Sequence, residues 1–414
     1  MPLSEIFFVN ITYIFKLFYM RTVVKYFIII FMLNNNLICQ ENLIKSIQLL
    51  DVNNNEKLIF NDFEFITVIF DELNENIRSF YYEIEHYDFN WKLSNVRKSE
   101  FLDGFDDIRI TNYNKSYNTL QNYIHYRFQI PNKNLSLTKS GNYKIIVKDN
   151  NGNYIFSRKF ILIRNPHIGS IEISKPRNID FQNSNQNLKI TIPCNDCNFN
   201  NNSFQYKLIV HKNYNLKNSK VIDYPTFKLA DSFVFDNITF SGGLQFFNFD
   251  NSNILNTSIE IKNINLNTTY VTELREDKIS NIYVYEPDIN GKYIIKNNKE
   301  NKFTESEYSN VIFSLQTDKV NNYPVYVIGN FNNYETNENS ILKKINNQYR
   351  IELFLKQGFY NYKYVIKENN SNNEIENFWQ TENLYTAILY EKRPEENYFK
   401  IKAIAKNNSS NIVN

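Results

Sequence analysis

The stretch YRIELFLKQGFYNYKYVI, residues 349–366, decides the fold class of this chain. Apolar side chains stand at every second position over residues 349–355, and again over residues 360–366. Side chains at every second position of a strand lie on the same face of a sheet. Each half is therefore predicted as a strand with its apolar face inward and its polar face, which includes Lys356, outward.

The same alternation recurs elsewhere in the chain, at residues 79–84, 143–148 and 188–192. No segment shows a sustained helical period with capping residues at its ends. Strands at short spacing with turns between them are typical of antiparallel sandwiches. The sequence therefore predicts an all-β protein of tandem antiparallel β-sandwich domains of the immunoglobulin-like, early-set kind.

Two Asn-Gly pairs mark turns between predicted strands, at residues 151–152 and 290–291. Asn and Gly both tolerate positive φ, which a two-residue type I′ turn requires. Both pairs are therefore predicted to close hairpins.

The length of 414 residues predicts two to four domains, because one domain takes roughly 100–200 residues. Polar stretches suggest the boundaries: one follows Arg164-Asn165-Pro166, and the segment 296–306 is predicted as a linker. We expect β-domains at 41–165, 166–305 and 306–406, with a disordered tail at 407–414.

The first forty residues resemble an export signal. A basic segment begins at Met20, an apolar run covers residues 26–33, and a cleavage site is expected near Gln40. This run is too short to span a bilayer. Residues 1–19 are also apolar, so an uncleaved anchor stays open, but Met20 is favoured as the start. We predict residues 1–40 as a signal segment.

Composition places few constraints on function. The formal net charge of +2 gives no indication of nucleic-acid binding. Cys194 and Cys197 form an isolated C-x-x-C, whereas a zinc site needs about four ligands. In an exported protein this pair is expected to be a local disulfide or an unimportant pair of thiols.

Sequence motifs of catalytic or cofactor sites are absent: there is no G-x-S-x-G, H-E-x-x-H, P-loop or G-x-G-x-x-G. His86 and His125 lie in strand-like patterns and are interpreted as core or edge residues. A glycosidase pair of distant carboxylates has no positive support. We therefore predict no catalytic, cofactor or metal site, and a protein that is not an enzyme.

The segment FLDGFDD, residues 101–107, places three aspartates around a Gly-Phe pair. A calcium loop of the EF-hand kind alternates its oxygen ligands over about twelve residues and ends in a bidentate Glu, which this segment lacks. Asp103 and Gly104 are predicted as a tight turn, and Ile108 as the start of a strand.

Longer blocks of the sequence resemble a known family. EFLDGFDDIRITNYNKSYNTLQNYIHYRFQIPN at 100–132 and SGNYKIIVKDNNGNYIFSRKF at 140–160 resemble the first domain of the type IX secretion system plug proteins of Bacteroidetes. VFDNITFSGGLQFFNFD at 234–250 and VYVIGNFNNYE at 325–335 resemble later parts of the same family. The positions that carry the family signature in the first domain are Trp91, Asp103, Gly104, Phe105 and Asp106.

The resemblance implies a function. Plug proteins are periplasmic, bind the outer-membrane translocon barrel and close its periplasmic opening. For this chain the resemblance implies a monomer within a heteromeric complex. It also implies attachment to the inner side of the outer membrane through that partner, with no cofactor and no nucleic acid.

A second resemblance concerns the C-terminal part. The block at 325–335 is also similar to the early-set sandwich of glucan-binding modules, which stack sugars on exposed aromatic rings. Tyr334 and Trp379 are the candidate stacking residues. The alternative is that Tyr334 packs at the edge of the sandwich and Trp379 in the core or an interface, because kinship of fold does not carry function.

Overall fold

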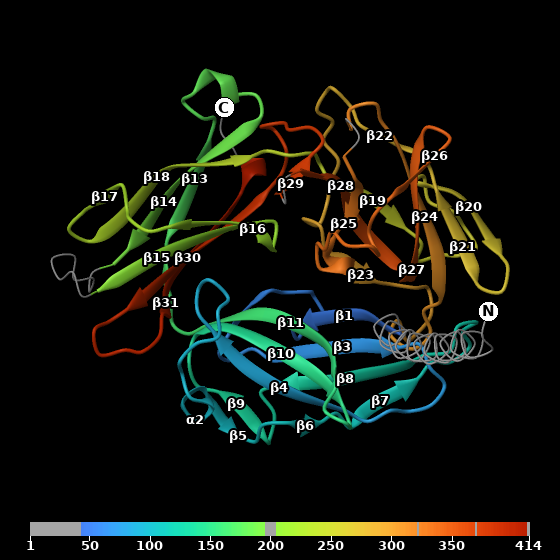
Figure 1. Cartoon of the computed structure of the whole chain (residues 1–414), viewed down its shortest axis with the longest axis horizontal. Helices are drawn as coiled ribbons and strands as arrows, with labels where there is room; N and C mark the ends of the chain where they lie inside the picture. The colour runs from blue at the N-terminus through green and yellow to red at the C-terminus, as the bar shows by residue number, and fades with distance from the viewer. Residues whose placement is uncertain (1–42, 195–203, 321–322, 369–370, 412–414) are drawn as a thin grey trace, which may run out of the picture. The chain divides into compact units, whose positions relative to one another are not determined.

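The computed structural model describes residues 43–194, 204–320, 323–368 and 371–411 (Figure 1). Residues 1–45 and 46–414 form separate compact units, and in the first of them only residues 43–45 are described. The predicted signal segment at 1–40 lies outside the described residues. Strands make up 53% and helices 3%, which confirms the predicted all-β class.

The first sandwich is built by residues up to Ile163. One sheet has the order β1 (Ile44–Leu50), β3 (Ile66–Glu72), β8 (Ile124–Ile130), β7 (Asn112–Lys115). The other has the order β2 (Ile59–Asn61), β11 (Tyr154–Ile163), β10 (Gly141–Asp149), β4 (Phe80–Tyr87), β6 (Ile108–Arg109). A short helix α2 (Lys98–Phe101) leads into β5 (Leu102–Gly104), which pairs with β9 (Leu135–Leu137). Residues of β4 alternate between buried and half-buried, as the sequence predicted.

The second sandwich combines two distant parts of the chain. One sheet has the order β13 (Ser170–Ser174), β14 (Asn185–Pro193), β18 (Ser232–Ser241), β17 (Phe227–Lys228). The other has the order β12 (His167–Ile168), β31 (Lys400–Asn408), β30 (Leu384–Lys392), β15 (Gln205–Lys212), β16 (Asn215–Ile222). Two 3-10 helices, η1 (Ile179–Phe181) and η3 (Ser409–Asn411), complete this part.

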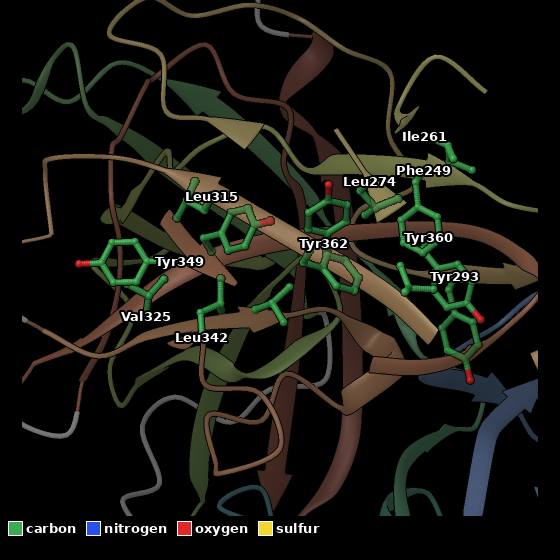
Figure 2. Close-up of a cluster of buried hydrophobic side chains, with 14 of the residues drawn as sticks. Phe249, Ile261, Leu274, Tyr293, Leu315, Val325, Leu342, Tyr349, Tyr360 and Tyr362 are labelled. Carbon is green, nitrogen blue, oxygen red and sulfur yellow. The ribbon is translucent and has the colours of Figure 1, made fainter. Parts of the chain in front are cut away.

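The third sandwich has a core in which tyrosine and phenylalanine rings pack with aliphatic side chains. Its first sheet is centred on β28 (Gly358–Glu368), which pairs with β19 (Phe247–Asp250), β23 (Tyr293–Ile295), β25 (Val325–Ile328) and β29 (Ser371–Glu374). Its second sheet has the order β20 (Ile261–Leu266), β21 (Tyr270–Leu274), β24 (Tyr308–Gln316), β27 (Gln348–Lys356), β26 (Lys343–Ile345), and β22 (Asp277–Lys278) pairs with β24. The helix η2 (Asn330–Asn332) follows β25. Figure 2 shows this core, where Phe249 stacks on Tyr360 with ring centroids 5.0 Å apart.

The third sandwich is inserted into the second. It begins after β18 and ends before β30, and its two connections to the second sandwich lie side by side. The Phe378 amide donates to the Gly243 carbonyl oxygen (3.0 Å), and the Thr381 hydroxyl donates to the same oxygen (2.6 Å). Strand pairing therefore crosses the boundary predicted at residue 305, because β30 and β31 pair not only with each other but also with β15 and β12, which lie before that boundary.

Two segments expected to lack structure are packed. β31 runs to Asn408, and the Ser409 hydroxyl, which is buried, donates to the Thr381 carbonyl oxygen (2.9 Å). The predicted tail is therefore ordered as far as residue 411. The predicted linker at 296–306 lies within the third sandwich, where the Phe303 ring stacks on His125 of the first sandwich with centroids 5.2 Å apart.

The two Asn-Gly turns differ from the prediction in opposite ways. Asn290 and Gly291 have φ of 56° and 81°, as a type I′ turn requires. No strand leads directly into this turn, however, so the pair does not close a hairpin. Gly152 lies in a true hairpin between β10 and β11, but that loop is longer than two residues. There the Asp149 carboxylate accepts from the Asn151 and Asn153 amides (2.9 Å each), so a side chain organises the loop.

Candidate functional site

The signature segment forms a fixed loop with one exposed aromatic ring. Asp103 and Gly104 belong to strand β5, so the predicted turn at this pair is wrong, and the bend falls at residues 106–107. Gly104 has φ +117°, and a Cβ there would lie 2.1 Å from the Asn134 carbonyl oxygen. That same oxygen accepts from the Phe105 amide (2.8 Å). The backbone is thus held against Asn134, while the Phe105 side chain is 71% exposed.

Acidic residues flank Phe105 in the sequence. Asp103, Asp106 and Asp107 are all exposed. The Asp106 carboxylate is hydrogen-bonded to the Lys98 ammonium at the start of helix α2. Asp107 has φ +61°, which Asp tolerates better than most residues. The loop therefore exposes one apolar ring and three carboxylates.

Trp91, the remaining signature position, is half-buried. It packs against a cluster of buried residues that belong to both the first and second sandwiches, among them Ile163 and Ile209. The Lys159 ammonium lies 4.5 Å from its ring centroid. Trp91 thus covers part of the junction between these two sandwiches.

The two candidate stacking residues are not presented together. Tyr334 is 5% exposed, and its hydroxyl is 3.3 Å from the Asn213 carbonyl oxygen, to which it donates. Its ring belongs to a small core cluster with Phe246 and Ile328, so it has no open face for a sugar. Trp379 is half-buried, with the Lys175 ammonium 4.0 Å from its ring centroid.

Cys194 is buried at the end of β14 and is disulfide-bonded. Cys197 lies outside the described residues, so the pairing of these two cysteines stays a prediction.

A buried charge network joins the first and third sandwiches. Lys356, predicted to face outward, is fully buried, and its ammonium donates to Asp71 Oδ2 (2.5 Å). The same Asp71 oxygen accepts from the Tyr308 hydroxyl (2.7 Å), and Oδ1 lies 2.7 Å from His125 Nδ1. Lys356 also donates to the Phe303 carbonyl oxygen (2.6 Å). The face of β27 that carries Lys356 therefore forms an interface between sandwiches rather than a solvated surface.

The network keeps Asp71 ionised. Burial alone would raise the pKa of this carboxyl, but the charge of Lys356 and the hydrogen bond from His125 outweigh it and hold the pKa below its usual value. A buried charge of this kind is tolerated only while its partner remains in place.

The second and third sandwiches share a similar arrangement. The Glu374 carboxylate of β29 pairs with Lys363 of β28 (3.0 Å) and with Lys212 of β15 (3.6 Å). The Lys212 ammonium also donates to the Ser241 and Gly242 carbonyl oxygens. Burial lowers the pKa of Lys212 to about 8.

A cavity of about 290 Å³ is lined by residues of all three sandwiches, and we call it the basic cavity. Its positively charged lining residues are Lys57, Lys144, Arg158, Lys159, Lys217 and Lys292. Its acidic lining residues are Glu56 and Glu335. A larger cavity of about 640 Å³ adjoins it and shares Asn215, Lys217 and Tyr334.

Sequence reasoning missed both charged arrangements. The lysines of the basic cavity are spread from residue 57 to residue 292 and make no local motif. Lys144 and Lys159 stand on the polar faces of their strands, where a lysine normally faces water. Asp71 follows the apolar run FITVIF at residues 65–70, and this was the one signal that could have indicated a buried carboxylate.

The described residues contain no group of three or more His, Cys, Asp or Glu side chains that could hold a metal ion. Within the same ranges no helix has the length and apolar character needed to cross a membrane.

Comparisons with known proteins agree with the first resemblance. Residues 44–164 match the family described as Type 9 secretion system plug protein 1st domain. These residues cover the first sandwich and its signature loop. No curated protein matches the chain.

A solved structure shares the fold. It is the crystal structure of a hypothetical protein from Parabacteroides merdae ATCC 43184, which is 24% identical with a TM-score of 0.83. The match covers 88% of this chain and 97% of that chain. At this level of identity the likeness concerns the fold alone.

Proposed function

We propose that this chain is a plug of the type 9 secretion system. The reason is that residues 44–164 match the family of the first domain of that system's plug proteins. In the proposed role the chain binds the outer-membrane translocon barrel from the periplasm and seals its periplasmic opening. The family match carries this proposal.

The buried links between sandwiches support the proposed role. A wide barrel lumen is filled with water, so a body that closes it must keep its form against a large opening. Asp71 and Lys356 tie the first sandwich to the third. The Tyr390 hydroxyl donates to Asn142 Oδ1 (2.6 Å) in a buried link between the second sandwich and the first. Such links resist hinge motion between sandwiches.

The signature loop is the part of the first sandwich that we assign to contact with the barrel. Phe105 is large, apolar and exposed, and aromatic residues are enriched at the centres of protein interfaces. Its backbone is fixed by Gly104, so little conformational entropy is lost on binding. The proposed activity is occlusion, and we propose that the chain is not an enzyme.

The proposal is tested by recovering the tagged full chain from envelope membranes and identifying its partners. We expect the translocon barrel to co-purify with the wild-type chain, and deletion of the gene to raise outer-membrane permeability. Unchanged permeability together with no barrel in the recovered material would refute the plug function.

The contact surface is tested separately with Phe105→Ser. We expect much less barrel to be recovered with this variant. Phe63→Ser is the matched control, because Phe63 is a 78% exposed phenylalanine of the same sandwich outside the signature. If both variants recover the barrel as the wild type does, the contact lies on another surface and the plug function still stands.

A further inference from the structure

The basic cavity gathers cations from three sandwiches, and most of them have no carboxylate partner, although Lys144, Lys159 and Lys292 each lie over an aromatic ring. Lys57 forms an ion pair with Glu64 (2.9 Å), which lies outside the cavity lining. The other five cations take part in no ion pair anywhere in the part of the chain that the structure describes. These five are Lys144, Arg158, Lys159, Lys217 and Lys292.

Two of these cations stand directly opposite each other. Lys144 of β10 and Lys159 of β11 are partners in the antiparallel register. Like charges at directly opposed positions destabilise a sheet. Burial, followed by the charges of Lys144 and Lys217, lowers the pKa of Lys159. The lysines are therefore close enough to repel one another at this surface.

The acidic residues of the lining offset only part of this charge, because Glu56 attracts Arg158 and Lys292, and Glu335 attracts Arg158 and Lys217. Burial raises the pKa of Glu56 to about 7, in spite of the nearby Lys292, so this carboxyl is partly neutral at physiological pH. The Gln48 side-chain amide donates to the Glu56 carboxylate (3.4 Å) and holds it in the lining of the basic cavity. Counting Glu335 as well, the positive residues of the lining outnumber the acidic ones by six to two.

We propose that the basic cavity binds a small, multiply charged phosphate compound whose anionic groups lie between Lys144, Lys159 and Lys217. Such a ligand would replace the repulsion among these lysines by attraction. Nothing in the proposed plug role requires this site, and the proposal does not depend on that role.

The chemistry of the lining favours phosphate. Arg158 offers a planar fork that matches phosphate oxygens, and lysine ammonium groups bind phosphate as point charges. Asn215, Asn330 and Asn333 add amide groups that suit neutral hydroxyls on the same ligand. A cavity of about 290 Å³ is close to the lower limit for ligand sites, about 300 Å³, which favours a compact ligand.

The site would also couple the sandwiches. Lys159 comes from the first sandwich, Lys217 from the second and Lys292 from the third. A ligand held by all three binds best when the sandwiches keep their present arrangement. By linkage it stabilises that arrangement.

The test is isothermal titration calorimetry of the full chain with pyrophosphate, beside a sedimentation assay with phosphatidylglycerol vesicles. We expect saturable binding by the wild type and affinity weakened about tenfold or more in Lys159→Gln/Lys217→Gln, because two charge-assisted contacts are lost. The matched control is Lys228→Gln/Lys278→Gln, two exposed lysines away from the cavity, which should change affinity less than about twofold. Binding to pyrophosphate identifies a soluble ligand, and binding to vesicles alone identifies a lipid headgroup.

A second readout separates binding from folding. Lys159→Gln alone should abolish part of the rise in melting temperature that pyrophosphate causes in the wild-type chain, because one of the three lysines that hold the ligand is lost. The proposal is overturned if the wild type binds neither probe, or if the cavity variant and the control variant lose affinity equally.

Discussion

The backbone at Gly104 has φ +117°, and any side chain there would meet the Asn134 carbonyl oxygen. Gly104→Ala must therefore shift the backbone of the β5–β9 pair and break its contact. We expect the variant to lose about 3 kcal/mol of unfolding free energy, measured by urea denaturation followed by circular dichroism.

Gly152→Ala is the matched control for this prediction. Gly152 has φ +80°, but a Cβ there meets no atom within 4 Å. Only the cost of positive φ remains, about 1 kcal/mol. Equal losses in the two variants would mean that the close approach to Asn134 does not constrain residue 104.

Residue identity alone could not predict which charged side chains are buried. Lys356 and Lys363 both occupy polar positions of strands whose sequence alternates, and both strands were predicted correctly. Yet both lysines are buried, because other parts of the chain cover those faces. Alternation reports which face is apolar, and it says nothing about what covers the polar face.

At the scale of elements, β30 and β31 complete a sheet whose other strands lie more than 160 residues earlier in the chain. A fragment of residues 166–305 lacks both strands and leaves β15 without its central partner. We expect this fragment to be unfolded, with no dispersion of its amide signals in nuclear magnetic resonance spectra.

A second fragment tests the insertion directly. Residues 165–243 joined to 379–414 through a short Gly/Ser linker should fold, because Phe378 and Thr381 lie against Gly243. Cooperative thermal unfolding of this chimera is the expected result. Folding of the 166–305 fragment, or failure of the chimera, would contradict the insertion.

Strand positions were predictable, but their partners were not. Period two identified strands at 79–84, 143–148 and 349–355 because it depends only on local alternation. Partner choice depends on the whole chain, and neighbours in sequence are usually neighbours in a sheet. β30 and β31 follow that tendency with each other, but their other partners, β15 and β12, lie far earlier in the chain, and no local feature of residues 384–408 indicates those partners.

At the scale of the whole molecule, Asp71 and Lys356 decide whether the first and third sandwiches unfold together. Asp71→Asn leaves Lys356 buried without a counter-charge, and breaking a buried pair costs about 3–5 kcal/mol. We expect the wild type to unfold in a single urea transition and Asp71→Asn to unfold in two. Asp71→Asn/Lys356→Met should recover much of the loss, because no unpaired charge remains.

Acid titration provides a further check on the same pair. The pKa of Asp71 lies below its unfolded value of about 3.9, so its contribution to stability is present above that value and is lost as pH falls through the folded pKa. The groups that face Asp71 are Lys356, His125 and Tyr308. Asp71→Asn should lack the part of acid destabilisation that appears below about pH 4.

The exposed pair of Lys189 and Glu172 is the control for the buried pair. Lys189→Met should lower the free energy of unfolding by less than about 1 kcal/mol.

The insertion of one sandwich into another also sets an order of events during synthesis. The ribosome synthesises β18 first, then the whole third sandwich, and only afterwards β30 and β31. At about 5–20 residues per second, the interval between Ser241 and Leu384 is on the order of ten seconds. During that time β15 has an open edge, while the first and third sandwiches already have all their strands. The second sandwich is therefore the last to close, and a chain cut short near its end would retain two finished sandwiches beside a strand, β15, that pairs with β16 and has its other edge exposed.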